Sequence, residues 1–178
     1  MSNEIGLIFQ GIEDIHGFKT CFFIHRHKVL KDAKMTYFHI VCKIWPHKKE
    51  THLVQLTVGG YKITFYRPVY TPTSNITNSK LHWNSIISTP GSKYLGVDVA
   101  NFYLNSIMAK QEYYNIAISL IPQEVIDEYN LMDKKINGFL CVRVEKGIYG
   151  LVQAVIISRT AFKEHIQPFV YEPAPITP

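Results

Sequence analysis

Four segments rich in β-branched and aromatic residues follow one another early in the chain, and they constrain the fold more than any other feature. This composition is typical of strands. The segments span residues 20–25, 37–45, 52–58 and 61–66. Basic, turn-like stretches separate the first three segments. The pattern therefore predicts an antiparallel hairpin layer with positively charged tips.

Helices and further strands are predicted in the rest of the chain. Leu81, Trp83 and Ile86 lie near helical spacing behind possible Asn and Thr caps. The pattern predicts a helix over 76–88, a strand that holds Asp98 at or just past its end, a strand over 113–118, a helix from Pro122, a strand over 139–144 and a helix from near Leu151. These elements indicate the α+β class, an antiparallel sheet with packed helices.

Size and charge limit the kind of protein. A chain of 178 residues suits one domain, or a core domain with a satellite lobe. Its net charge of +5 favours an anionic partner such as nucleic acid. The start of the sequence lacks the pattern of a signal peptide, and no run of 18 apolar residues occurs. We therefore expect an intracellular protein, cytoplasmic or nuclear, with no membrane partner. Three cysteines within apolar runs, Cys21, Cys42 and Cys141, suit buried thiols.

Asp98 is the one acid in an apolar run, "KYLGVDVANFYLN". Two interpretations are open from the residues alone. The carboxylate could be a buried structural group, hydrogen-bonded to a turn or paired with a lysine. It could instead hold Mg²⁺, which binds protein carboxylates together with substrate phosphates.

Two ordered motifs resemble copia-type retrotransposon reverse transcriptases, which are RNA-directed DNA polymerases. "DVANFYLN" at 98–105 and "GIYGLVQA" at 147–154 are similar to the first two core motifs of that family. Residues 21–60 resemble its fingers region, 71–93 its approach to the palm, and 121–131 a stretch that follows the first motif. The resemblance therefore covers nearly the whole chain and implies the fingers and partial palm of a right-hand polymerase.

The resemblance assigns roles to individual residues. It implies that Asp98 is a catalytic ligand of two Mg²⁺ ions, with the Val99 carbonyl as a further ligand. It implies that Tyr103 lies beneath the nucleotide sugar and that Gln153 contacts the incoming nucleotide. Lysines on the basic loops would face nucleic acid: Lys28, Lys31, Lys48 and Lys49.

Several departures from the family pattern predict a loss of polymerase activity. Gln55 stands where the family commonly has an arginine that grips the triphosphate, and Trp45 replaces another cation. "GLVQAV" has Val152 for a proline and Val155 for a glycine. The family's third motif contains an Asp-Asp pair, and no such pair occurs in this sequence. We therefore expect weak or absent Mg²⁺ binding and a chain that stops short of its own active site.

The resemblance also implies a division of the chain and a set of partners. Residues 1–90 would form a fingers-like region, 91–110 a palm segment, 111–155 a second fingers segment and 156–178 the start of a truncated palm continuation. Expected partners are an RNA/DNA primer–template, deoxynucleotide triphosphates in the intact family, and the remainder of a Pol polyprotein. Two alternatives remain open: a non-catalytic nucleic-acid-binding remnant, and an unrelated α+β binding domain whose motifs match by chance.

Overall fold

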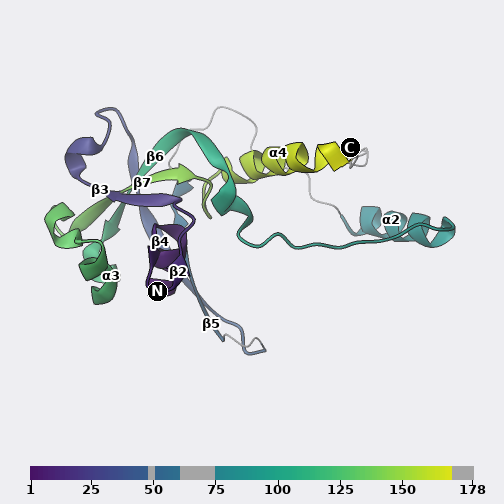
Figure 1. Cartoon of the computed structure of the whole chain (residues 1–178), viewed down its shortest axis with the longest axis horizontal. Coiled ribbons are helices and arrows are strands. Elements are labelled where there is room, and N and C mark those ends of the chain that lie inside the picture. The colour runs from purple at the N-terminus through teal and green to yellow at the C-terminus, as the bar shows by residue number, and fades with distance from the viewer. Residues whose placement is uncertain (48–50, 61–74, 170–178) are drawn as a thin grey trace.

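The computed structural model describes residues 1–47, 51–60 and 75–169 of the chain, and its fold is α+β (Figure 1). The helices and strands are α1 (Ser2–Ile8), β1 (Gly11–Ile12), β2 (Ile15–His16), β3 (Cys21–Ile24), β4 (Met35–Ile44), β5 (His52–Val58), α2 (Ile76–Ser88), β6 (Ile107–Ala117), α3 (Gln123–Glu128), β7 (Phe139–Lys146) and α4 (Ala154–Ile166). The strands predicted over 20–25, 37–45, 52–58, 113–118 and 139–144 are confirmed. The segment 61–66 lies outside the described residues.

The main sheet has five strands in the order β3-β7-β6-β4-β5. The β4–β5 pair is the expected antiparallel hairpin, with Phe38 opposite Val58 and Ile44 opposite His52. The prediction of one antiparallel layer is wrong for the first two strands. β3 pairs with β7, and β4 runs parallel to β6. A strand's composition favours extended backbone but does not select its neighbour, so sequence order was a poor guide to the pairing.

One face of the sheet carries the main hydrophobic core, which packs against α1 and α3. Ile5, Ile8 and Phe9 are fully buried there, and the Phe9 ring stacks on Phe23 with 4.2 Å between centroids. Burying each such side chain stabilises the fold by about 1.5–3 kcal/mol. The sequence pattern predicted neither α1 nor the β1–β2 hairpin, although α1 supplies part of this core.

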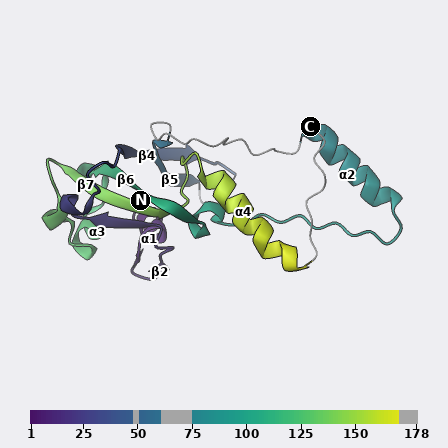
Figure 2. The ribbon, with the colours of Figure 1, turned by 90° about the horizontal axis from the view of Figure 1, so that it is seen from above.

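α2 has the predicted bounds, but it does not join the core. The side chain of its N-cap residue, Asn75, accepts a 2.8 Å hydrogen bond from the backbone N–H of Asn78. All residues of α2 are described and none is buried; Leu81 is 63% exposed. Figures 1 and 2 show α2 well away from the sheet. Its apolar side chains therefore lack the packing that their helical spacing suggested.

The prediction of a strand with Asp98 at or just past its end is wrong. Residues 92–99 are exposed and belong to no strand, and Phe102–Asn105 form a short 3-10 helix, η3. This segment returns from α2 toward the sheet, and its Tyr94 ring contacts Trp83 of α2, with 4.5 Å between centroids. A strand requires a neighbouring strand to satisfy its backbone groups, and this returning segment has none among the described strands.

All three cysteines are free thiols, as expected, but they differ in burial. Cys21 and Cys141 are buried, whereas Cys42 is exposed. The prediction of burial is therefore wrong for Cys42, because it lies in the part of β4 that extends beyond the core. In the part of the chain that is described, no helix is long and apolar enough to cross a membrane.

Candidate functional site

The fold brings together the two motifs that the sequence analysis singled out. The η3 segment, in the first motif, contacts the turn before α4, in the second. The Tyr103 and Tyr149 rings meet edge to face, with 5.3 Å between centroids. The backbone N–H of Gly147 donates a 2.7 Å hydrogen bond to the carbonyl of Ser106. The two motifs therefore form one surface, although the 41 residues from 106 to 146 separate them in the chain.

The end of β5 joins the same surface through close backbone contacts. The Val58 N–H donates to the Tyr149 carbonyl at 2.9 Å. Gly150 has a φ of +90°, and a Cβ added there would lie 2.2 Å from the Val58 carbonyl oxygen. A Cβ added at Gly60 would lie 2.1 Å from the Gly150 carbonyl oxygen. Glycine at both positions is what allows the β5 end and the second motif to approach this closely.

The pKa values of two ionisable side chains, Tyr149 and Glu4, are raised by their surroundings. Burial raises the pKa of the Tyr149 hydroxyl, and repulsion from Glu4, Tyr103 and Asp98 raises it further. Asp98 is the smallest of these three contributions, and the residue is exposed. Burial also raises the pKa of Glu4, and this effect is opposed by a 3.1 Å hydrogen bond that Glu4 accepts from the Leu56 N–H.

The residues around Asp98 do not fit a two-ion metal centre. Mg²⁺ demands near-octahedral oxygen coordination, and bridging two ions requires carboxylates from more than one place in the fold. Asp98 supplies one carboxylate, and the resemblance adds only the Val99 carbonyl. Within residues 1–47, 51–60 and 75–169, no group of three or more His, Cys, Asp or Glu side chains could hold a metal ion.

Gln153 lies at the start of α4, near the end of the second motif. It is the N-cap residue of α4, and its backbone carbonyl accepts a 3.1 Å hydrogen bond from the Ile157 N–H. The predicted helix start near Leu151 is therefore correct to within three residues. The Gln153 side chain is buried and lines a cavity of about 620 Å³ whose lining residues do not include Asp98 or Tyr103.

The lysines that were predicted to contact nucleic acid lie at three places in the chain. Lys28 is exposed in the short 3-10 helix Arg26–Lys28. Lys31 is exposed on the following loop and lines the same cavity as Gln153. Lys48 and Lys49 lie outside the described residues. The structure thus brings one predicted nucleic-acid contact, Lys31, and one predicted nucleotide contact, Gln153, to a common cavity.

No family model, curated protein or solved structure matches the chain.

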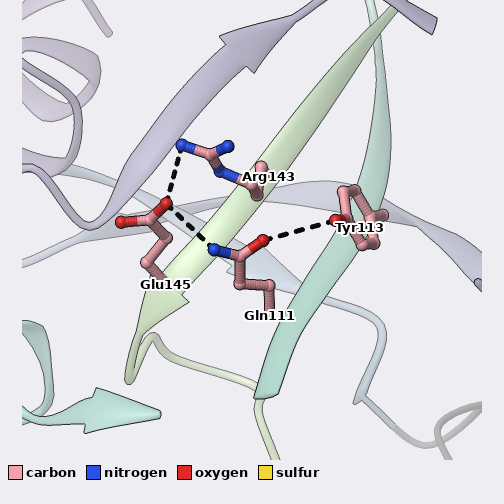
Figure 3. Close-up of polar contacts among 4 residues, drawn as sticks. All are labelled: Gln111, Tyr113, Arg143 and Glu145. Atoms are coloured by element: carbon pink, nitrogen blue, oxygen red, sulfur yellow. Dashed lines mark hydrogen bonds and ion pairs between the residues drawn. The ribbon is translucent and has the colours of Figure 1, made fainter. Parts of the chain in front are cut away.

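The sequence did not reveal a series of polar side-chain contacts on the second face of the sheet (Figure 3). The Arg143 guanidinium pairs with the Glu145 carboxylate at 2.7 Å, and the Gln111 amide donates to the same carboxylate oxygen at 3.4 Å. The Tyr113 hydroxyl donates to Gln111 at 3.3 Å. Gln111 and Tyr113 also line the cavity. Their alternate spacing on β6, matched by Arg143 and Glu145 on β7, was a signal that they share one face.

Proposed function

We propose that this chain is a fragment of a copia-type retrotransposon reverse transcriptase, comprising fingers and part of the palm, and that it does not polymerise alone. The contact between the first and second motifs carries the proposal. Tyr103 and Tyr149 meet at 5.3 Å, and the glycines of "VGG" and "GIYG" allow the backbones between them to approach closely. Motif residues that match a family by chance have no reason to converge on one surface.

Under this proposal Asp98 and Tyr103 would face the primer end and the incoming nucleotide. Asp98 is exposed at the end of the returning segment, and Tyr103 is half-buried with its ring fixed against Tyr149. A half-buried aromatic held in this way suits a steric role toward a sugar. The missing carboxylates and the replacement of a cation by Gln55 would prevent nucleotidyl transfer, because both remove charge stabilisation from the transition state. The remainder of a polyprotein is the partner that would supply these groups inside the cell.

The second candidate is a non-catalytic nucleic-acid-binding remnant. One observation favours it: exposed lysines gather around the cavity, whereas among the described residues no group of metal-binding side chains surrounds Asp98. Lys31, Lys34 and Lys110 line that cavity. Phosphate contacts by lysines supply affinity that does not depend on sequence and decreases with salt.

Primer extension tests the proposal that the chain does not polymerise. The chain and its Asp98→Asn variant are each incubated with an RNA template, a DNA primer, the four triphosphates and either Mg²⁺ or Mn²⁺. We expect no extension from either protein, against a retroviral reverse transcriptase as positive control. Extension by the chain that the Asp98→Asn variant lacks would contradict the proposal and would indicate that an unrecognised acid completes the site.

The fragment assignment itself is tested by binding. We expect an RNA/DNA hybrid primer–template to bind at low salt and to lose affinity when Tyr103 is replaced by alanine. Tyr94→Ala is the control, because Tyr94 lies in the returning segment before Asp98 and its ring contacts His82 and Trp83. Equal affinities for the two variants would argue against a role for Tyr103 at a nucleotide-facing surface.

A further inference from the structure

The main sheet ends at β5, the last strand in the order β3-β7-β6-β4-β5. On the side of β5 that faces away from β4, no other described strand pairs with it. Figure 1 shows the β4–β5 hairpin extending beyond the rest of the sheet. An edge strand presents backbone N–H and C=O groups that can pair with another chain, so each group on this side either has a partner or remains open.

Hydrogen bonds at the two ends of β5 show which residues face the open side. The Thr51 carbonyl accepts from the Trp45 N–H at 2.7 Å, and the Gly59 N–H donates to the Tyr37 carbonyl at 3.1 Å. Bonded and non-bonded pairs alternate along an antiparallel ladder, and the register of β4 and β5 is unbroken. The odd-numbered residues from 51 to 59 therefore bond to β4, and the even-numbered residues from 52 to 58 direct their backbone groups to the open side.

Two of these even-numbered residues already have partners. The Leu56 N–H donates to the Glu4 carboxylate at 3.1 Å, and the Val58 N–H donates to the Tyr149 carbonyl at 2.9 Å. A side chain and a loop carbonyl thus cover the half of the edge that lies against the core, which is one way in which native sheets protect an edge.

The outer end of β5 is left open. Among the described residues, the backbone N–H groups of His52 and Val54 have no hydrogen-bond partner. Native edges are commonly protected by a lysine, a proline or a β-bulge, and β5 has none of these. Leu53, between the two open residues, is 40% exposed. This end of β5 can therefore accept another strand.

The open end is complementary to itself. When a twofold axis passes beside Leu53, antiparallel pairing puts His52 of one copy opposite Val54 of a second copy, and Val54 opposite His52. Each of these pairs exchanges two backbone hydrogen bonds, so all four open N–H groups are satisfied. Leu53 lies opposite its own counterpart in a non-hydrogen-bonded pair, where cross-strand side chains are closest. The two exposed leucine side chains therefore cover each other.

This register also stops where the edge is already covered. The next pair after the bonded ones joins Gln55 to Thr51 of the second copy, and beyond it lies Leu56, whose N–H Glu4 already occupies. A register centred on Val54 would instead pair His52 with Leu56 and displace Glu4. Pairing about Leu53 is thus the arrangement that uses every open N–H group and breaks no existing hydrogen bond.

Charge does not oppose this pairing. β5 contains no lysine, arginine, aspartate or glutamate. The residue opposite Leu53 on β4 is Lys43. Its counterpart in the second copy would lie three strand spacings away, about 14 Å, which exceeds the Debye length of about 10 Å at about 0.1 M salt. These two lysines are therefore largely screened from each other.

We propose that the open end of β5 pairs with the same segment of a second copy of this chain, joining two main sheets into one. Only His52, Leu53 and Val54 of each copy form the centre of the contact, so it is smaller than the about 1,200–2,000 Å² that stable interfaces bury. The dimer is therefore weak and forms at high protein concentration. The proposal uses no residue of the two core motifs and does not depend on the reverse transcriptase assignment.

Sedimentation velocity of the full chain tests the proposal at concentrations from about 10 μM to about 1 mM, where weak interfaces become populated. We expect a monomer at the lower end and a growing fraction of dimer toward the upper end. Hydrogen exchange, followed residue by residue by NMR on the same samples, locates the contact. The N–H groups of His52 and Val54 should exchange about tenfold more slowly as the dimer forms. The Leu56 N–H is the internal control, because its bond to Glu4 is present in the monomer.

Two variants with the same added charge test the register. Leu53→Lys places two ammonium groups opposite each other at the axis and should weaken dimerisation about tenfold. Ile44→Lys is the matched control, because Ile44 is 69% exposed and lies on β4, away from the paired edge. It should leave dimerisation unchanged. Val54→Pro is the second test, since it removes an open N–H group that takes no part in the pairing with β4, and it should also weaken dimerisation.

Three results would overturn the proposal. The first is a chain that remains monomeric at about 1 mM. The second is slow exchange of the His52 and Val54 N–H groups at every concentration, because another segment of the same chain would then cover the edge. The third is a dimer that both Leu53→Lys and Val54→Pro leave intact, which would place the contact elsewhere on the molecule.

Discussion

Replacing Gly150 by alanine should destabilise the fold more than a backbone effect alone explains. Gly150 has a φ of +90°, and an added Cβ would lie 2.2 Å from the Val58 carbonyl oxygen and 3.0 Å from the Val58 nitrogen. The left-handed backbone costs a non-glycine residue about 1–2 kcal/mol. Forcing an extra carbon into a packed site costs about 1–3 kcal/mol more. We therefore expect the free energy of unfolding to fall by about 2–5 kcal/mol in Gly150→Ala.

Gly138→Ala provides the matched control. Gly138 has a similar φ of +81°, but no described atom lies within 4 Å of an added Cβ. Only the backbone cost of about 1–2 kcal/mol should therefore appear. Urea unfolding followed by circular dichroism measures both variants. Equal losses of stability would refute the reasoning, because they would mean that the second motif does not press against the end of β5.

Three further predictions address other parts of the structure. Cys42 is exposed while Cys21 and Cys141 are buried, and burial raises the pKa of the Cys21 thiol. A thiol reagent should therefore modify Cys42 first and the other two cysteines only on unfolding. Rapid modification of all three thiols would contradict the described burial. Burial raises the pKa of Glu4 in the folded state, so its contribution favours folding below the ordinary carboxyl pKa and is lost as the pH rises through the raised value. Glu4→Gln, which keeps an acceptor for the Leu56 N–H, should therefore flatten the dependence of unfolding free energy on pH, and an unchanged pH profile would be inconsistent with that assignment. Neutralising Lys28, Lys31, Lys48 and Lys49 together should make the affinity for a hybrid duplex less sensitive to salt, and an unchanged slope of log affinity against log salt would remove these lysines from the interface.

The local structure of this chain was largely predictable from its sequence. The helix α2 has the predicted bounds because residues at its two ends specify them: Asn75 caps the N-terminus, and the helix breaks after Ser88. The strand β5 was predicted at His52–Val58 for the same kind of reason, a run of suitable side chains between turn signals. Signals of this kind depend on neighbours along the chain.

The parts that failed depend on neighbours in space. The segment around Asp98 has the residues of a strand, but the fold places no strand beside it, and its apolar side chains remain exposed. Pairing of β3 with β7 joins residues about 120 positions apart, which no local pattern specifies. α1 has only seven residues, too few for a clear helical period, although Ile5 and Ile8 anchor the core.

The candidate site was likewise predicted only in part from the sequence. Asp98, Tyr103 and Gln153 were named from the motifs, and the structure brings Tyr103 to Tyr149 and places Gln153 in the lining of a cavity. Glu4, Lys110 and Gln111 were not named, because each is an ordinary polar residue in sequence. Glu4 becomes relevant because it accepts a hydrogen bond from the Leu56 N–H, and Lys110 and Gln111 because they line the cavity.

Hydrogen–deuterium exchange on binding an RNA/DNA hybrid primer–template tests the central claim most directly, since it locates the contact without requiring catalysis. The claim is that residues 98–104 and 147–153 form a nucleotide-facing surface. We predict slower exchange of backbone N–H groups in both segments when the hybrid is added at low salt, with α3 on the opposite part of the fold unchanged as an internal control. Binding of the hybrid with no protection in either segment would contradict the claim.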